Sequence, residues 1–172
     1  KSYIGATLSQ ILVDDESVKS GEILVIAPTT LHDQDNWLGE VHKFSDLTLT
    51  KVESEDDFQI PSDMYIVGPE RFRIMCETDT GTYNPKNVII RKKFKCIIFD
   101  ESAKLKSGTS QLTKIFHRYC YENKIPYVFL MTGLPAPNTV FQLWGQAAAL
   151  GYWLGENYNA FEIRYGTPRN VT

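Results

Sequence analysis

The sequence predicts an α/β fold in which helices cover both faces of a mostly parallel sheet. The first observation is that short apolar runs alternate with segments whose apolar residues recur at helical spacing. The second is that these runs lack polar alternation, which is typical of parallel strands buried on both faces. The third is the length, because 172 residues suit one domain with a sizeable core. We therefore expect one α/β domain over residues 1–172.

The predicted elements follow in order along the chain. Strands are expected at 22–27, 47–52, 64–67, 96–99 and 127–131. Helices are expected at 2–12, after a cap at Asp33 or Asp35, at 70–76, at 111–121 and at 140–150. The first helix is predicted from the helical spacing of Ile4, Leu8, Ile11 and Leu12. The inner face of the second should carry Trp37, Leu38, Val41 and Phe44, and the last contains a face of Ala147, Ala148 and Ala149. The polar segments 14–21, 53–57 and 78–86 predict loops, the last of them exposed and mobile.

Composition limits the classes of function. The chain has 42% hydrophobic and 23% charged residues, as ordinary soluble globular proteins do. A formal net charge of −3 argues against coating nucleic acid by bulk electrostatics and restricts such contact to a local patch. Three cysteines without CxxC spacing predict free thiols in a reducing compartment. We recognise no signal peptide and no bilayer-spanning apolar run, so we expect a cytoplasmic protein without membrane contact.

Two adjacent carboxylates, Asp100 and Glu101, directly follow the apolar run 96–99. Open parallel sheets bind ligands at the carboxyl ends of their strands, so both side chains should lie at a ligand-binding edge. In P-loop nucleotidases the aspartate at this place helps to hold Mg²⁺, and a neighbouring glutamate can orient or deprotonate the attacking water. The run 127–131 ends in Thr-Gly-Leu-Pro at 132–135 and should reach the same edge. These two strand ends together predict a nucleotide site.

The chain opens with Lys1 and Ser2, the pair that ends a phosphate-binding loop at the start of a helix. In such a loop, upstream glycine N–H groups cradle the phosphates, the lysine reaches the β- and γ-phosphates, and the hydroxyl binds Mg²⁺. The pair alone is a weak signal that gains weight from Asp100 and Glu101. We therefore expect the chain to begin inside its own nucleotide site.

With these residues in place, the sequence resembles superfamily II helicase-type ATPases, specifically the Snf-type (chromatin-remodeller-like) branch in its short phage and bacterial form. The resembling segments are Lys1-Ser2 (end of motif I), 25–31 (motif Ia), Trp37 with Glu40 (the Trp-x-x-Glu of the branch), 66–71 (motif Ib), 100–106 (motif II), 132–138 with Leu143-Trp144 (motif III), and 154–155 with 160–165 (the Phe-x-x-Arg-Tyr segment). They occur in the family's order along nearly the whole chain.

The resemblance implies the N-terminal RecA-like lobe of a DNA-dependent ATPase that translocates on DNA or remodels it. Lys1 would bind the β- and γ-phosphates of ATP, Ser2 and Asp100 would hold Mg²⁺, and Glu101 would position the water. Thr132 and Gly133 would relay the nucleotide state to the DNA-facing loops. The cell would be a bacterium or a phage-infected host.

The resemblance also implies sequence-independent contact with duplex or branched DNA. Thr29, Thr30 and the turn at Gly68 are the candidate contacts to phosphate, because the motif Ia and Ib loops leave the sheet at the same edge.

Three features depart from the family pattern. Ala103 stands where remodellers usually have a histidine, and Leu134 stands where the family usually has a second threonine. Both changes remove polar contacts between the nucleotide site and motif III, so weaker coupling is expected. The family's second RecA-like lobe, which supplies arginine fingers, has no counterpart after Tyr165. We therefore expect one lobe of a larger enzyme, nearly inactive alone, with a second lobe in cis or in trans.

Two other functions stay open: a non-catalytic lone lobe that binds DNA or a partner, and a P-loop enzyme of another kind, such as a nucleotide kinase.

Trp37 and Trp144 are interpreted as core residues rather than nucleic-acid stackers. His32, His42 and His117 lack ligand spacing, which favours surface or capping roles. A basic group near motif II is interpreted as a solvated face, with a groove for the DNA backbone as the alternative. It comprises Arg91, Lys92, Lys93, Lys95, Lys104 and Lys106.

Overall fold

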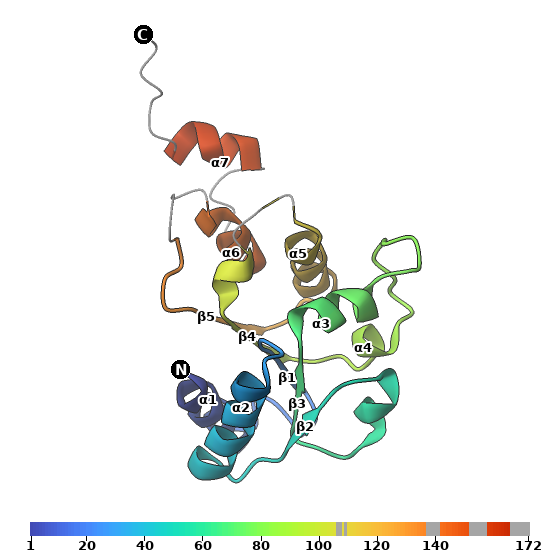
Figure 1. Cartoon of the computed structure of the whole chain (residues 1–172), viewed down its shortest axis with the longest axis vertical. Helices are drawn as coiled ribbons and strands as arrows, with labels where there is room; N and C mark the ends of the chain where they lie inside the picture. The colour runs from blue at the N-terminus through green and yellow to red at the C-terminus, as the bar shows by residue number, and fades with distance from the viewer. Residues whose placement is uncertain (106–107, 109, 137–141, 152–157, 166–172) are drawn as a thin grey trace.

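The computed structural model of the chain describes residues 1–105, 108, 110–136, 142–151 and 158–165. The described strands form one five-stranded sheet in the order β2-β3-β1-β4-β5, with every pairing parallel (Figure 1). They are β1 (Ile23–Ile26), β2 (Leu49–Lys51), β3 (Met64–Val67), β4 (Cys96–Asp100) and β5 (Tyr127–Met131). The predicted α/β class and its parallel sheet are confirmed.

Helices cover both faces of this sheet. They are α1 (Ser2–Asp14), α2 (Leu31–Phe44), α3 (Pro69–Cys76), α4 (Val88–Arg91), α5 (Gln111–Asn123), α6 (Leu143–Ala149) and α7 (Tyr158–Tyr165), with the 3₁₀ helices η1 (Glu55–Gln59) and η2 (Ser102–Leu105). Helices α1 and α2 pack on one face, and α3, α4 and α5 pack on the other (Figure 1). In the described parts of the chain, no helix combines the length and apolar character needed to cross a bilayer.

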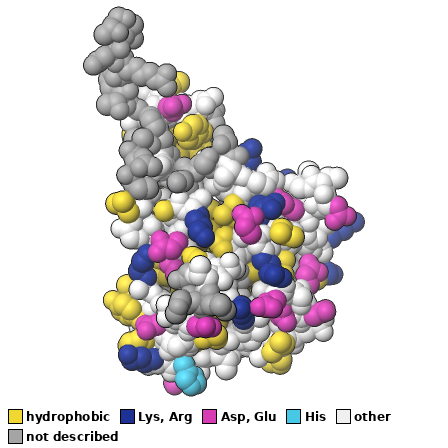
Figure 2. Space-filling model, in the orientation of Figure 1, with side chains coloured by type: hydrophobic (Ala, Val, Ile, Leu, Met, Phe, Trp, Pro, Cys, Tyr) yellow, Lys and Arg dark blue, Asp and Glu magenta, His cyan; other side chains and the backbone are white. Residues whose placement is uncertain are grey.

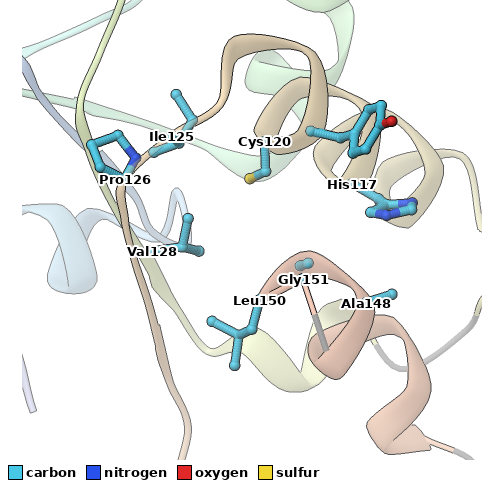
Figure 3. A pocket seen from close by; sticks show the side chains of 10 residues that line it. His117, Cys120, Ile125, Pro126, Val128, Ala148, Leu150 and Gly151 are labelled. Carbon is cyan, nitrogen blue, oxygen red and sulfur yellow. The ribbon is translucent and has the colours of Figure 1, made fainter. Parts of the chain in front are cut away.

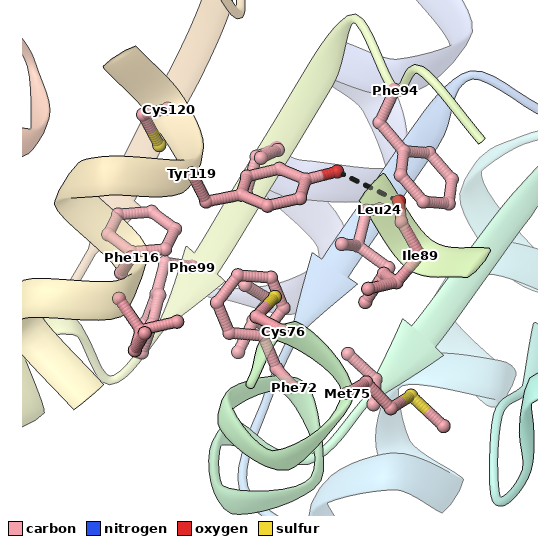
Figure 4. Close-up of a cluster of buried hydrophobic side chains, with 14 of the residues drawn as sticks. Leu24, Phe72, Met75, Cys76, Ile89, Phe94, Phe99, Phe116, Tyr119 and Cys120 are labelled. Atoms are coloured by element: carbon pink, nitrogen blue, oxygen red, sulfur yellow. Dashed lines mark hydrogen bonds between the residues drawn. The ribbon is translucent and has the colours of Figure 1, made fainter. Parts of the chain in front are cut away.

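Two hydrophobic cores result, because successive side chains of a strand point to opposite faces. Ile23 and Val25 of β1 face α1 and α2, whereas Leu24 belongs to the core under α3 and α5. The second core is rich in aromatic side chains (Figure 4). In it the Phe72 ring packs edge-on against Tyr119 at a centroid distance of 5.3 Å. These cores fix the strands whose ends carry the predicted site.

The buried face of α1 consists mainly of small residues. Gly5, Ala6, Ser9 and Leu12 are buried. Ile4 and Ile11, whose spacing predicted the helix, are 51% and 54% exposed. A Cβ added at Gly5 would lie 2.5 Å from Cη2 of Trp37, so only a residue without a side chain permits this approach of α1 to α2.

Helix α2 begins earlier than predicted. Its N-cap is Thr30, so neither Asp33 nor Asp35 caps the helix. Trp37 and Val41 are buried as expected, whereas Leu38 and Phe44 are 37% and 41% exposed. The buried stripe follows the 3–4-residue spacing of Gln34, Trp37 and Val41, and it leaves the other two apolar side chains at its margin.

Two predicted loops contain ordered structure. The acidic segment 53–57 includes the start of η1, which is closed by a capping box between Ser54 and Asp57. The segment 78–86 folds back through a bridge between Glu77 and Tyr83, and the Tyr83 ring is only 7% exposed. Helices α4 and α7 were not expected. The last predicted helix, 140–150, is described only from 142 and is helical over Leu143–Ala149.

The three cysteines are free thiols, as predicted. Cys76, Cys96 and Cys120 are all buried in the cores. Burial raises the pKa of Cys96 to about 12 and raises the pKa of the other two thiols further.

Candidate functional site

Four neighbouring strands end at one edge of the sheet, in the order β3, β1, β4 and β5. Ile26 is in register with both Val67 and Phe99, and Asp100 is in register with Met131. The residues that follow at this edge are Gly68, Thr29 with Thr30, Glu101, and Thr132 with Gly133. Because neighbouring strands lie about 4.8 Å apart, the β3 and β5 ends are separated by about 14 Å. The predicted nucleotide residues occupy the β4–β5 half of this edge, and the predicted DNA contacts occupy the β3–β1 half.

Asp100 is held by two N–H donors at the end of β4. The indole Nε1 of Trp37 donates to its Oδ2 at 2.9 Å, and the backbone N of Glu101 donates to its Oδ1 at 2.9 Å. A carboxylate has about four lone-pair positions, so each oxygen can still accept a further ligand. Trp37 is 1% exposed, which confirms its core position. Its second role, orienting Asp100, was missed because the partners lie 63 residues apart.

Glu101 turns the chain away from the sheet. Its φ of 53° is in the left-handed region, which costs a non-glycine residue roughly 1 kcal/mol. Its carboxylate forms an ion pair with the Nζ of Lys1. This contact brings the first residue of the chain to the end of β4, which lies between the central strand β1 and the edge strand β5. Lys1 and Glu101, which were assigned to one site from the sequence, therefore touch each other.

The loop after β5 closes this group. A Cβ added at Gly133 would lie 3.7 Å from Lys1 Nζ, so the lysine lies between motif II and the Thr132-Gly133 segment. The Ser2 hydroxyl, in contrast, makes no hydrogen bond with Asp100 or Glu101 in the described residues. Ser2 therefore joins the site only through its place beside Lys1 at the start of α1.

The group has the donors that a nucleotide-bound cation requires. Within the described ranges, no three or more His, Cys, Asp or Glu side chains gather into a metal cluster. Mg²⁺ in phosphoryl-transfer sites is instead held by one or two protein oxygens and the phosphates of the substrate. One oriented carboxylate, Asp100, beside a lysine ammonium fits that arrangement.

A polar link joins motif II to the loop after β5, although Ala103 lacks the side chain that was expected to form one. The Ser102 hydroxyl donates to Oε1 of Gln146 at 2.9 Å. Nε2 of Gln146 then donates to the Pro135 carbonyl at 2.6 Å. A polar connection between these two segments is therefore present, and the weaker coupling expected from Ala103 and Leu134 stays a prediction. Nothing in the sequence marked Gln146, because its partners lie on two other segments.

At the other half of the edge, Thr29 packs onto Gly68. A Cβ added at Gly68 would lie 2.1 Å from Cγ2 of Thr29. Gly68 is buried under this methyl group, whereas Thr29 and Thr30 are exposed. Thr30 and Gly68 are also the N-caps of α2 and α3, so two helix N-termini open at this place. Backbone N–H groups at helix N-termini favour anions such as phosphate.

The basic residues near motif II do not form one group. Lys95 precedes β4 and pairs with Glu22 at 3.2 Å, whereas Lys104 follows the strand in η2. A five-residue strand separates these positions by about 17 Å. Lys92 is tied to the fold, since its Nζ donates to the Phe58 carbonyl at 2.8 Å. On the face drawn in Figure 2, positive and negative side chains are interspersed, as expected for a solvated surface.

A separate cavity of ≈ 410 Å³ lies between α5, β5 and α6 (Figure 3). It is lined by His117, Cys120, Val128 and Leu150, among others. Burial lowers the pKa of His117, which favours its neutral form. The lining includes Ile125 and Pro126, which precede β5, and does not include Thr132 at the other end of that strand. We assign it no part in the site.

Of the remaining residues that the sequence marked as candidates, some pack within the fold or lie on its surface, and others lie outside the described ranges. Trp144 is half-buried and packs edge-on against Tyr158 at 5.7 Å, in keeping with a packing role. His42 is exposed, and the side chain of His32 lies outside the description. Residues 137–138 of motif III, Lys106 and the segment 154–155 also lie outside the described residues.

The parallel sheet, the helices on both faces and the polar carboxyl edge together define a RecA-like α/β lobe. The fold is similar to that of the Sulfolobus solfataricus SWI2/SNF2 ATPase core in complex with dsDNA, with a TM-score of 0.68 and 20% identity over 94% of this chain and 31% of that one.

The chain belongs to the SNF2-related domain family, which it matches over residues 6–170. It is 32% identical over 163 residues to the putative protein p41 of Acyrthosiphon pisum secondary endosymbiont phage 1. It is 26% identical over 145 residues to the ISWI chromatin-remodeling complex ATPase ISW2 of Saccharomyces cerevisiae. Each match covers 83% of this chain but only 32% and 12% of the relative, respectively. The chain thus corresponds to the first RecA-like lobe of an Snf2-type enzyme and spans less than a third of these relatives.

Proposed function

We propose that this chain is the ATP-binding lobe of a DNA-dependent ATPase that couples hydrolysis to movement on DNA or to its remodelling. The observation that carries this proposal is the contact of Lys1 with Glu101 beside the oriented carboxylate of Asp100. A lysine for phosphate, a carboxylate for Mg²⁺ and a second carboxylate for water are the parts that ATP hydrolysis needs. The relatives named as ATPases support this reading.

Each residue has one role in this proposal. Lys1 leaves Glu101 to bind the β- and γ-phosphates, and Glu101 then holds and deprotonates the attacking water. Asp100 and Ser2 would hold Mg²⁺, which would supply positive charge beside the phosphates. Thr132 and Gly133 transmit the nucleotide state toward the β1 and β3 loops. A second RecA-like lobe, in cis or in trans, completes the site, so the chain alone hydrolyses ATP negligibly.

The test is ATP hydrolysis by the full-length protein with and without duplex DNA. Turnover should rise with DNA of any sequence, and the stimulation should weaken steeply as salt increases, because phosphate contacts release counterions. Turnover that DNA leaves unchanged would contradict DNA dependence. DNA binding without any ATP hydrolysis would instead favour the non-catalytic lobe.

The DNA contacts are tested by changing Thr29 and Thr30 together to valine. The change removes two exposed hydroxyls and keeps the Thr29 methyl group that packs on Gly68. DNA-stimulated turnover should fall by more than basal turnover, because these loops lie on the other half of the edge from Lys1 and Asp100.

The matched control replaces Lys104 and Lys106 by alanine. If they belong to a solvated face, DNA affinity should change by less than about tenfold, or about 1.4 kcal/mol. A large loss with the lysine variant and none with the threonine variant would reverse the assignment of the groove. Equal loss of basal and stimulated turnover in the threonine variant would place Thr29 and Thr30 in the ATP site or the fold.

The orienting role of Trp37 is tested by Trp37→Phe. This change keeps an aromatic ring in the core and removes the indole N–H group that donates a hydrogen bond to the Asp100 carboxylate. A hydrogen bond to a charged group contributes about 1.5–3 kcal/mol, so turnover should fall about tenfold or more. The Mg²⁺ concentration for half-maximal turnover should rise as well. Val41→Ala is the control, because Val41 also lies on α2 and is buried in the same hydrophobic core as Trp37. An equal effect of the two variants on the Mg²⁺ requirement would reduce Trp37 to packing alone.

A further inference from the structure

Gln146 of α6 joins two parts of the site that are distant in sequence. Its Oε1 accepts a hydrogen bond from Ser102 Oγ at 2.9 Å, and its Nε2 donates to Pro135 O at 2.6 Å. Gln146 is 6% exposed and Ser102 is 0% exposed, so water cannot readily replace the hydrogen bond between them. Both ends of one amide are thereby used, and its orientation is fixed.

Each partner of Gln146 is next to a residue of the proposed ATP site. Ser102 directly follows Glu101, and Pro135 lies two residues after Gly133. Gly133 lies beside Lys1 Nζ, which pairs with Glu101. The contacts therefore form a closed ring that leads from Glu101 through Gln146 and the loop after β5 to Lys1 and back to Glu101.

Helix α6 gives this ring a rigid support. A Cβ added at Gly145 would lie 1.9 Å from the Leu105 carbonyl oxygen and 2.9 Å from Cγ2 of Thr113. The backbones of α6 and η2 approach this closely only because residue 145 is glycine. Gln146, the next residue, is therefore held at a set distance from η2, the short helix that begins with Ser102.

We propose that Gln146 is a positioning residue for ATP hydrolysis. It fixes the turn that carries Glu101 relative to the loop that carries Gly133, and so sets the position of the Glu101 carboxylate with respect to Lys1. The inference rests on the proposed function. It assigns to Ser102 and Gln146 the connection that Ala103, with only a methyl group, cannot make. Displacing a reacting group by about 1 Å can cost about 100-fold in rate.

The first test compares Gln146→Met, Ser102→Ala and the double variant in the full-length protein, with duplex DNA present. Each change opens the same ring, so kcat should fall about tenfold or more while KM for ATP stays within about twofold. The double variant should lose little more than either single variant, because coupled residues are not additive. All assays run below the unfolding transition of the least stable variant.

The matched control is Ser62→Ala. Ser62 is also buried, at 8% exposed, and its hydroxyl donates to the Met64 carbonyl at 2.9 Å and lies 3.4 Å from the Thr48 hydroxyl. Ser62 precedes β3, so it lies at the edge of the sheet where the strands begin, whereas Asp100 and Glu101 lie at the edge where the strands end. This variant should lose comparable stability with unchanged kcat. An equal fall of kcat in Ser62→Ala and Ser102→Ala would reduce the Ser102–Gln146 bond to a stability contact.

The second readout is the pH profile of Gln146→Glu. The protonated carboxyl of this variant can accept a hydrogen bond from the Ser102 hydroxyl and donate one to the Pro135 carbonyl oxygen, as the amide does. The ionised form cannot donate, and it places a negatively charged oxygen next to that carbonyl oxygen. Burial raises the pKa of such a carboxyl. The kcat of this variant relative to the unmodified protein should therefore be highest at low pH and fall as pH rises through that pKa.

The outcomes separate the two proposals. Unchanged kcat in Gln146→Met, or a kcat ratio for Gln146→Glu that is constant with pH, would overturn the role of Gln146 alone. If Gln146→Met does not fold, Ser102→Ala and Gln146→Glu decide by the same readouts. An unmodified protein that does not hydrolyse ATP would overturn the proposed function and this inference with it.

Discussion

Glu101→Gln should reduce ATP turnover by the full-length protein about 10²–10⁴-fold, the usual contribution of a general base. ATP should still bind, because Asp100 and Lys1 stay in place. Binding should be at least as tight as before, since the amide no longer holds the Lys1 ammonium in an ion pair. Single-turnover hydrolysis and equilibrium binding of a fluorescent ATP analogue measure the two effects separately.

The control for this prediction is Glu22→Gln. Glu22 also pairs with a lysine, Lys95, at 3.2 Å, but at the amino end of β4. Its loss should leave turnover within about twofold, because this partly exposed pair lies at the opposite end of β4 from Asp100 and Glu101. Equal turnover by the unmodified protein and Glu101→Gln would remove Glu101 from the hydrolytic step.

Asp100→Asn should abolish Mg²⁺-dependent hydrolysis, with a loss of about 10³-fold or more, because stabilisation through a bound metal ion amounts to several kcal/mol. The amide also has only one acceptor oxygen, while two N–H donors, from Trp37 and Glu101, point at this side chain. One donor would then face the amide nitrogen. Turnover as a function of Mg²⁺ concentration is the measurement.

A double variant separates the two effects of Asp100→Asn. Adding Trp37→Phe removes one of the competing donors and relieves the mismatch. If the mismatch alone inactivates the enzyme, the double variant should regain activity. If Asp100 binds Mg²⁺, the double variant should stay inactive while its unfolding temperature rises toward that of Trp37→Phe. Recovered turnover would therefore contradict the metal role.

The sequence predicted the strands and the carboxyl edge well. A parallel strand buried on both faces is a continuous apolar run, so Ile23–Ile26 and Cys96–Asp100 were recognisable without tertiary information. The polar residues at their ends, Asp100 and Glu101, then had to lie at one edge of the sheet. Register between neighbouring strands brings Met131, and with it Thr132, to the same place.

The sequence predicted poorly what depends on close packing between helices. In α1 the spacing of Ile4 and Ile11 indicated a helix but not its buried face, which contains small residues because Trp37 occupies the space above Gly5. Contacts between distant segments were equally hidden. The bonds of Trp37 with Asp100 and of Gln146 with Ser102 span 63 and 44 residues, respectively. No local pattern specifies such partners.

The burial of Cys76, Cys96 and Cys120 bears on how the motion of this lobe can be observed. Maleimide dyes react with thiolates, and burial raises the pKa of Cys96 to about 12, far above the pH at which labelling is done. The pKa values of the other two thiols are higher still. A cysteine introduced on the surface of this lobe can therefore be labelled selectively while its native cysteines are kept. Fluorescence energy transfer to a dye on the proposed second lobe would then test whether the two lobes close around ATP while the core of this lobe is unaltered.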